Sequence, residues 1–232
     1  MPIPIVALPE NDLLQRLPKK ETLAGLEPFP VHADDILAEA KGKITHFFFP
    51  ISGMISLVTQ FEDGGIVEVG CVGKEGLVGF EALLGAKTSQ WRAVGQIAGE
   101  AYKVPLARVV EIFSQNESAR AVLLNYLMQI LREVGQTCAC NVAHTVEERL
   151  ARWLLIAGDR VGTNHLVLTH EFISQMLGSR RSTVTVATGI LQRSGFIRYK
   201  RGHIEILDRE GLEQVACECY AAVSDKGPMS LR

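Results

Sequence analysis

The 232-residue chain predicts an α+β protein in three parts, and three features of the sequence carry this prediction. Glycines recur among short apolar runs between about Val31 and Val104, which is typical of short antiparallel strands. No proline interrupts residues 116–144, which favours one long helix. Two short helical patterns and a basic hairpin follow. We therefore expect an antiparallel β-domain at 1–115, a long helix at 116–144 and a winged helix-turn-helix domain at 145–232.

The N-terminal part has the sequence pattern of a compact β-sandwich or β-barrel. Its strand-length segments are ITHFFFP, MISLVTQF, GIVEVGCV, WRAVGQIA and EAYKVP. EDGG at 62–65 predicts a hairpin turn, because glycine adopts positive φ at little cost. Short helices are expected at residues 10–18, ending at Pro18, and at residues 106–115.

The predicted long helix carries a wide apolar stripe. A 4-3-4-3-4 spacing links Leu123, Leu127, Ile130, Val134, Thr137 and Asn141. The stripe is widened by Ala119, Val122, Tyr126 and Leu131. A helix of roughly 28 residues is about 40 Å long, too long for one small domain to cover. We favour pairing of this helix with its copy in a dimer over packing along its own β-domain, because the stripe is wide enough for two surfaces.

The stretch LTHEFISQMLGSRRSTVTVATGILQRSG at 168–195 has the pattern of a helix-turn-helix. Thr169 can cap a first helix, Gly178 can end it in a left-handed conformation, and Ser179 can cap a second helix from Arg180 to about Arg193. The expected inward positions of the second helix are Val184, Ala187, Ile190 and Leu191. The expected outward or rim positions are Arg180, Arg181, Ser182, Thr185, Val186, Thr188 and Gly189. Such a short, basic, hydroxyl-rich face suits the major groove of DNA.

The next segment, SGFIRYKRGHIEILD, predicts a β-hairpin wing turned at Arg201 and Gly202. Its candidate phosphate-binding side chains are Arg198, Lys200, Arg201 and His203. Residues 165–203 hold six Arg or Lys and one Glu, a net charge of +5, whereas the whole chain carries −2. A basic segment on an acidic body indicates local binding of a polyanion; the alternative is a solvated basic face.

Several other classes of protein are not supported. The sequence lacks G-x-S-x-G, P-loop, H-E-x-x-H and dinucleotide-binding patterns, so no enzyme activity and no catalytic residue are expected. No apolar run approaches the about 20 residues of a membrane span. The N-terminal MPIPIVALPENDLLQRL lacks the basic region of a secretory signal. We therefore expect a cytoplasmic location and no membrane partner.

Five cysteines, an odd number, argue against a disulfide framework. The pairs Cys138/Cys140 and Cys217/Cys219 lack the two-residue gap usual in zinc and iron–sulfur sites, and residues i and i+2 of a helix point about 200° apart. We expect no metal site and buried packing roles, with Cys219 inward and Cys217 outward on a C-terminal helix. Redox sensing through Cys138 and Cys140 is the alternative; the sequence does not assign the four residues a role.

The order of these parts resembles the Crp–Fnr superfamily of bacterial transcription regulators. The strongest carriers are VEERLARWLL at 146–155 and LTHEFISQMLGSRRSTVTVATGILQRSGFI at 168–197, with weaker matches at FFFPISGMISLV and GKEGLVGFEALLG. The resemblance implies a cyclic-nucleotide-binding-like β-roll, a homodimer formed by the long helix, binding to a near-palindromic operator in double-stranded DNA, and RNA polymerase as a partner. It implies base reading by Arg181, Ser182 and Thr185. It implies phosphate contacts from Thr169, His170, Arg180 and the wing.

Two departures from the family pattern predict a different operator and effector. Ser182 and Val186 occupy positions where relatives often carry Glu and Arg, so the half-sites TGTGA and TTGAT are not expected. In the phosphate cassette, Phe80 stands at the expected Glu and no Ser or Thr follows Arg92, so cyclic AMP binding in the usual mode is not expected.

The effector therefore stays open. The residues Phe80, Glu81, Trp91 and Arg92 either line a pocket for another effector or have structural roles. The first 70 residues hold no cysteine, which argues against an N-terminal iron–sulfur cluster. A haem on His32 or His46 is left open. The alternative function is a small-molecule or redox sensor that acts through protein partners and carries a degenerate helix-turn-helix.

Overall fold

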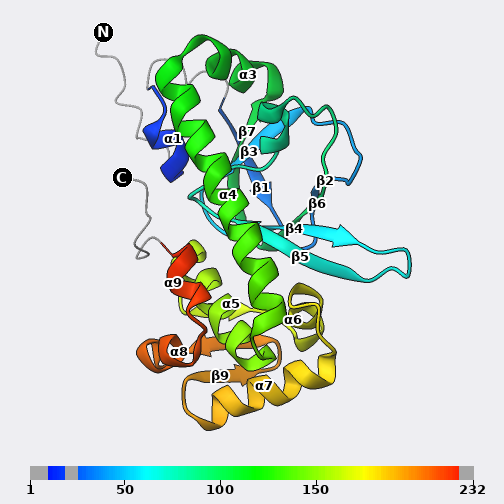
Figure 1. Cartoon of the computed structure of the whole chain (residues 1–232), viewed down its shortest axis with the longest axis vertical. Helices are drawn as coiled ribbons and strands as arrows, with labels where there is room; N and C mark the ends of the chain where they lie inside the picture. The colour runs from blue at the N-terminus through cyan, green and yellow to red at the C-terminus, as the bar shows by residue number, and fades with distance from the viewer. Residues whose placement is uncertain (1–9, 19–25, 225–232) are drawn as a thin grey trace.

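The computed structural model describes residues 10–18 and 26–224, so the first nine residues of the segment tested for a secretory signal lie outside it. A β-domain occupies one end of the molecule, helix α4 (Glu117–Ala143) runs along it, and a helical domain with a small sheet occupies the other end (Figure 1). This arrangement confirms the predicted α+β class and the order of the parts. None of the helices in the described ranges is long and apolar enough to cross a membrane.

The β-domain is a roll of two antiparallel sheets. One sheet has the order β1 (Glu27–Val31), β7 (Gly99–Pro105), β3 (His46–Pro50). The other has the order β2 (Ile36–Ala38), β6 (Arg92–Ile97), β4 (Met54–Gln60), β5 (Ile66–Val72). Phe47, Phe49 and Leu77 are fully buried in the core of the roll. The predicted EDGG turn joins β4 to β5, with Gly64 at φ +86°. The short helices α1 (Asp12–Arg16), η1 (Phe80–Leu84) and α3 (Leu106–Gln115) complete the domain.

Helix α4 begins after Asn116, whose side chain accepts a hydrogen bond from the backbone N–H of Ala119. Ala119, Leu123 and Tyr126 are buried in the core of the β-roll. The apolar side chains left exposed form a second stripe, one position further along: Leu124, Met128, Leu131 and Val142. The β-roll therefore covers part of the predicted stripe, and the contact of α4 with a second copy stays a prediction. The chain's own β-roll covers Leu123, and an adjacent face with the same spacing remains uncovered.

The C-terminal domain has its own apolar core. Its elements are α5 (Val146–Val161), β8 (His165–Val167), α6 (His170–Met176), α7 (Arg181–Arg193), β9 (Ile197–Lys200), β10 (His203–Ile206), α8 (Arg209–Val215) and α9 (Cys219–Val223). Thr145 and Glu148 form a capping box at the start of α5. Leu150, Leu154 and Ile173 are fully buried. Helix α6 lies beside β5 of the β-roll, so the two domains are in direct contact (Figure 1).

Candidate DNA-binding surface and effector region

Helices α6 and α7 form the predicted pair around a tight turn. The Oγ1 atom of Thr169 accepts a hydrogen bond from the backbone N–H of Phe172, 3.1 Å away, and caps α6. Gly178 adopts φ +56° in the turn. Contrary to our expectation, Ser179 does not cap α7. Its backbone N–H donates to the Ser174 carbonyl, which places Ser179 in the turn, and α7 starts one residue later, with Arg180 as its N-terminal cap.

The two faces of α7 are sharply divided. Val184, Ala187 and Leu191 are buried, as predicted, and Ile190 is half-buried. The outer face exposes the predicted residues Arg180, Arg181, Ser182 and Thr185 together with Val186. Thr188 was expected at the rim but is 2% exposed. It lies four residues after Val184 and three before Leu191, and this spacing places it on the packed face.

His170 connects three elements of this surface. Its ring stacks on Tyr199 of β9, with 4.1 Å between the ring centres. Thr185 donates its hydroxyl proton to the Arg181 carbonyl, which leaves the Thr185 oxygen to accept from His170 Nδ1 at 3.1 Å. Burial lowers the pKa of His170, and the positive charge of Arg181 lowers it further. His170 is therefore a neutral, half-buried support for Thr185. Tyr199 lay outside the sequence prediction because no local pattern pairs it with His170.

The wing has the predicted hairpin, with Arg201 at φ 49° and Gly202 at φ 82° in its turn. Strand β8 pairs with the other side of β10 and makes a three-stranded sheet. The side chains of Lys200, Arg201 and His203 are exposed. Arg198 is also exposed, but its Nη1 lies 2.6 Å from Glu205 Oε2, so a carboxylate offsets its charge. The strongest basic patch of the wing is therefore at its tip.

Comparisons with known proteins match both halves of this architecture. The cyclic nucleotide-binding domain family matches residues 28–116, and the Crp-like helix-turn-helix domain family matches residues 148–215. The chain belongs to the Crp–Fnr family. It is thus a transcription regulator with a helix-turn-helix DNA-binding domain, and its relatives are regulators, not enzymes.

Both comparisons by sequence and by structure find transcriptional regulators of Thermus thermophilus. The transcriptional regulator SdrP is 28% identical over 172 residues, which are 72% of this chain and 81% of SdrP. A solved CRP/FNR-family transcriptional regulator is 26% identical with a TM-score of 0.66, covering 82% of this chain and 98% of that one. FixK2 of Bradyrhizobium japonicum, at 16% identity, shares the fold with a TM-score of 0.72 and covers 83% and 98% of the two chains.

In this Crp–Fnr protein Phe80 and Trp91 line one small space, whereas Glu81 and Arg92 are engaged by other partners. Phe80 is 4% exposed and packs against Trp91 and against Tyr126 of α4, with ring centres 5.7 and 6.3 Å apart. The Glu81 carboxylate accepts hydrogen bonds from the Ser89 hydroxyl and the Gln90 backbone. Arg92 forms an ion pair with Glu39 at 2.8 Å. The space beside Phe80 and Trp91 is about 10 Å³, barely enough for one water molecule.

A partly buried charge cluster joins the β-roll, α4 and α5. Arg160 of α5 lies 2.9 Å from Glu75, which follows β5, and 2.7 Å from Glu133 of α4. Nearby, Trp153 of α5 donates its indole N–H to Glu68 of β5 at 2.9 Å. Burial raises the pKa of Glu75, whereas Arg160 opposes that rise. Sequence reasoning missed this cluster because its members are far apart in the chain and carry no local motif.

Proposed function

We propose that the protein is a homodimeric, sequence-specific transcription regulator that places α7 of each protomer in one half-site of a near-palindromic operator. The observation that carries this proposal is the outer face of α7, where a short hydroxyl-rich surface begins with two arginines and lies beside the basic wing tip. Short side chains allow a helix to approach base edges closely, while arginines reach guanines or phosphates.

The exposed residues divide by the chemistry they offer. Arg181, Ser182 and Thr185 are the base readers in this proposal, and the Val186 methyl groups suit a thymine methyl. The phosphate contacts come from Thr169, Arg180, Lys200, Arg201 and His203. We assign Arg198 a weaker contact because Glu205 offsets its charge. We assign His170 the support of Thr185.

Selection of bound sites from random double-stranded DNA tests this reading. We expect a two-fold symmetric sequence other than TGTGA or TTGAT, with half-site centres one helical turn, about 34 Å, apart. Recovery of either standard half-site would refute the assigned readers. Affinity that is insensitive to salt would refute the DNA contacts, because counterion release gives a slope of about −0.9 per phosphate contact. That outcome would favour the alternative, a sensor that acts through protein partners.

The dimer in this proposal uses an exposed stripe on α4, which we call the dimer seam: Leu124, Met128, Leu131, Gly135, Cys138 and Val142. Its 4-3-4-3-4 spacing is that of a parallel coiled coil, in which equivalent residues of two helices face each other. Mild oxidation should therefore join two chains through Cys138. Light scattering of the reduced Cys138→Ser variant should still report a dimer. A wild-type dimer that resists this crosslink would place the interface elsewhere.

The β-roll of this proposal does not take cyclic AMP in the usual mode. Phe80 is part of the apolar core, Glu81 is already hydrogen-bonded, and the space beside Phe80 and Trp91 is only about 10 Å³. Calorimetric titration with cyclic AMP should give no binding heat at millimolar nucleotide; saturable binding would overturn this part. We leave the effector open, including haem on His32 or His46, and expect no N-terminal iron–sulfur cluster. We further infer a cytoplasmic protein that acts with RNA polymerase.

A further inference from the structure

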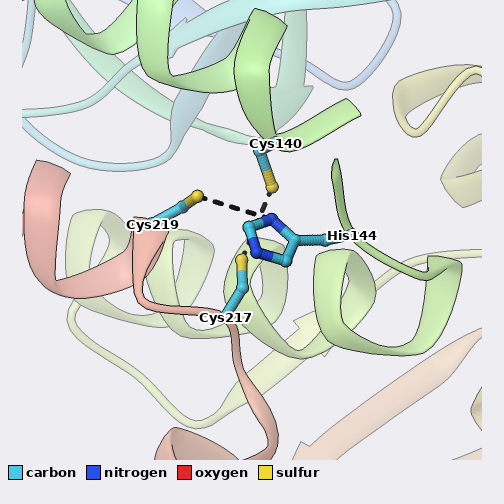
Figure 2. A group of neighbouring side chains, drawn as sticks. All are labelled: Cys140, His144, Cys217 and Cys219. Carbon is cyan, nitrogen blue, oxygen red and sulfur yellow. Dashed lines mark hydrogen bonds between the residues drawn. The ribbon is translucent and has the colours of Figure 1, made fainter. Parts of the chain in front are cut away.

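Four side chains with metal-binding atoms converge between α4 and the C-terminal segment (Figure 2). Cys140 lies in the last turn of α4, and His144 is the first residue after it. Cys217 lies in the turn between α8 and α9, and Cys219 begins α9. One ligand atom from each residue lies within 4.8 Å of all the others. Two segments of the chain, residues 140–144 and 217–219, thus supply a Cys₃His set at one point.

Two of the distances between the ligand atoms match those around a single tetrahedral ion. The Sγ atoms of Cys140 and Cys217 are 3.5 Å apart, and Cys219 Sγ is 3.6 Å from His144 Nδ1. A tetrahedral Zn²⁺ with Zn–S bonds of about 2.3 Å and Zn–N bonds of about 2.0 Å holds neighbouring ligand atoms about 3.5–3.8 Å apart. A two- or four-iron cluster binds its cysteines through different iron atoms and so needs a wider cage.

The surroundings of the four residues differ from an ordinary packing site. The three cysteines are at most 5% exposed and form a cluster of their own, separate from both apolar cores. His144 Nε2 lies 3.3 Å from a Glu218 carboxylate oxygen, so Nδ1 is the nitrogen turned toward the sulfurs. A carboxylate on the outer nitrogen is the usual support of a metal-binding histidine. Gln136 also donates an N–H to Cys219 Sγ, 3.0 Å away.

The fold corrects two expectations about the cysteines. Cys217 is buried, not outward, because α8 ends at Val215 and the helical periodicity used to place it no longer applies. Cys138 is exposed while Cys140 is buried, which does not favour a redox pair between them. Neither C-x-C pair forms a site by itself. One member of the first pair meets both members of the second, and this combination could not be read from spacing.

We propose that one Zn²⁺ binds to Cys140, His144, Cys217 and Cys219 through three thiolates and an imidazole. Binding displaces one proton from each of the three thiols to solvent and leaves the metal's oxidation state unchanged. His144 is the extended residue between α4 and α5. The ion would therefore link the C-terminal end of α4, which follows the dimer seam, to the C-terminal segment of the DNA-binding domain. One turn into α5, Arg149 donates to the Leu177 carbonyl at the helix-turn-helix turn. The ion therefore fixes the angle at which α7 leaves the dimer.

Metal analysis of the full-length protein, purified with reductant and without chelator, tests the site. We expect about one Zn per chain in the wild type and in Cys138→Ser, and loss of the metal in Cys140→Ser and Cys219→Ser. Cys138 is the matched control because it lies on the same helix, two residues from Cys140, and is exposed. Co²⁺ added to the metal-free wild type should give the visible absorption of tetrahedral thiolate coordination.

Several results would overturn the proposal. They are equal metal content in Cys138→Ser and Cys140→Ser, iron with acid-labile sulfide in protein purified without oxygen, or a Cys140–Cys217 disulfide in place of the metal. Circular dichroism of each variant identifies any that fail to fold. For those, the metal content of wild type and the Co²⁺ spectrum decide the question without a variant.

The effect of the ion on DNA binding rests on the proposed function, whereas the site itself does not. Removal of the ion with a chelator should lower operator affinity at least 10-fold while light scattering still reports a dimer, and Zn²⁺ should restore the affinity. Unchanged operator affinity after a measured loss of Zn would overturn the claim that the ion fixes the position of α7. The claim that the site binds Zn would stand. If the loaded protein binds no DNA at all, the proposed function fails while the metal content still reports on the site.

Discussion

The substitution Arg160→Met removes the cation that the buried Glu133 and the half-buried Glu75 share. Arg160, Glu75 and Glu133 have side chains that are 11%, 23% and 10% exposed, so water screens their charges weakly. Methionine keeps the length of the side chain but leaves both carboxylates without their partner. Breaking a buried pair in this way costs about 3–5 kcal/mol, and for a protein of this size that corresponds to a fall in Tm of about 6–20 °C.

The loss in Arg160→Met should depend on pH in a defined direction. Burial raises the pKa of Glu75, and the positive charge of Arg160 lowers it. The pKa of Glu75 should therefore be higher still in the Arg160→Met variant. A carboxyl group whose folded pKa lies above its unfolded pKa loses stability as pH rises through the folded value. The destabilisation should therefore be largest near pH 8 and smaller near pH 5, where protonation of Glu75 relieves its unpaired charge.

Urea unfolding followed by tryptophan fluorescence measures both effects. Arg92→Met is the matched control, because it breaks an ion pair with Glu39 whose partners are 29% and 52% exposed. We expect that control to lose less than about 1 kcal/mol. A loss in Arg160→Met as small as in the control, or one that is the same at both pH values, would refute the reasoning.

Three further changes test other parts of the structure. Leu131→Asp places a charge in the dimer seam and should halve the mass in light scattering; a persistent dimer would contradict the seam. Thr188→Val removes a buried hydroxyl without a hydrogen-bond partner in the described residues and should raise the free energy of unfolding by about 1 kcal/mol; a loss would reveal a missed partner. Tyr126→Phe leaves the buried Leu77 backbone groups unpaired and should cost about 1–3 kcal/mol in urea unfolding; a neutral result would contradict this.

The sequence predicts features that depend on neighbouring residues. Helix α3 matches residues 106–115, and α4 lies within one residue of the predicted bounds. The wing was also located correctly, since Arg201-Gly202 is a local turn signal. The helix-turn-helix was found because capping, glycine and periodicity occur together within a single short stretch, residues 168–195.

Features that depend on distant contacts were missed or misplaced. The exposed apolar stripe of α4 lies one position beyond the predicted stripe, because only the fold shows which of two neighbouring faces the β-roll covers. Thr188 was misplaced at a boundary between faces. Cys140 and Cys217 are 77 positions apart in the chain, and their meeting requires α9 to pack on α4. No spacing rule contains that information.

The central claim is that the outer face of α7 reads bases while the wing tip holds the backbone. It is tested most directly by the operator affinity of wild type, Arg181→Ala and Lys200→Ala over a range of salt concentrations. We expect Arg181→Ala to relax discrimination at one symmetric position by about 1–3 kcal/mol. Lys200→Ala should weaken all sequences alike and reduce the salt slope by about 0.9 for each protomer. Equal preference for every sequence in wild type, or loss of base discrimination in Lys200→Ala but not in Arg181→Ala, would contradict the account.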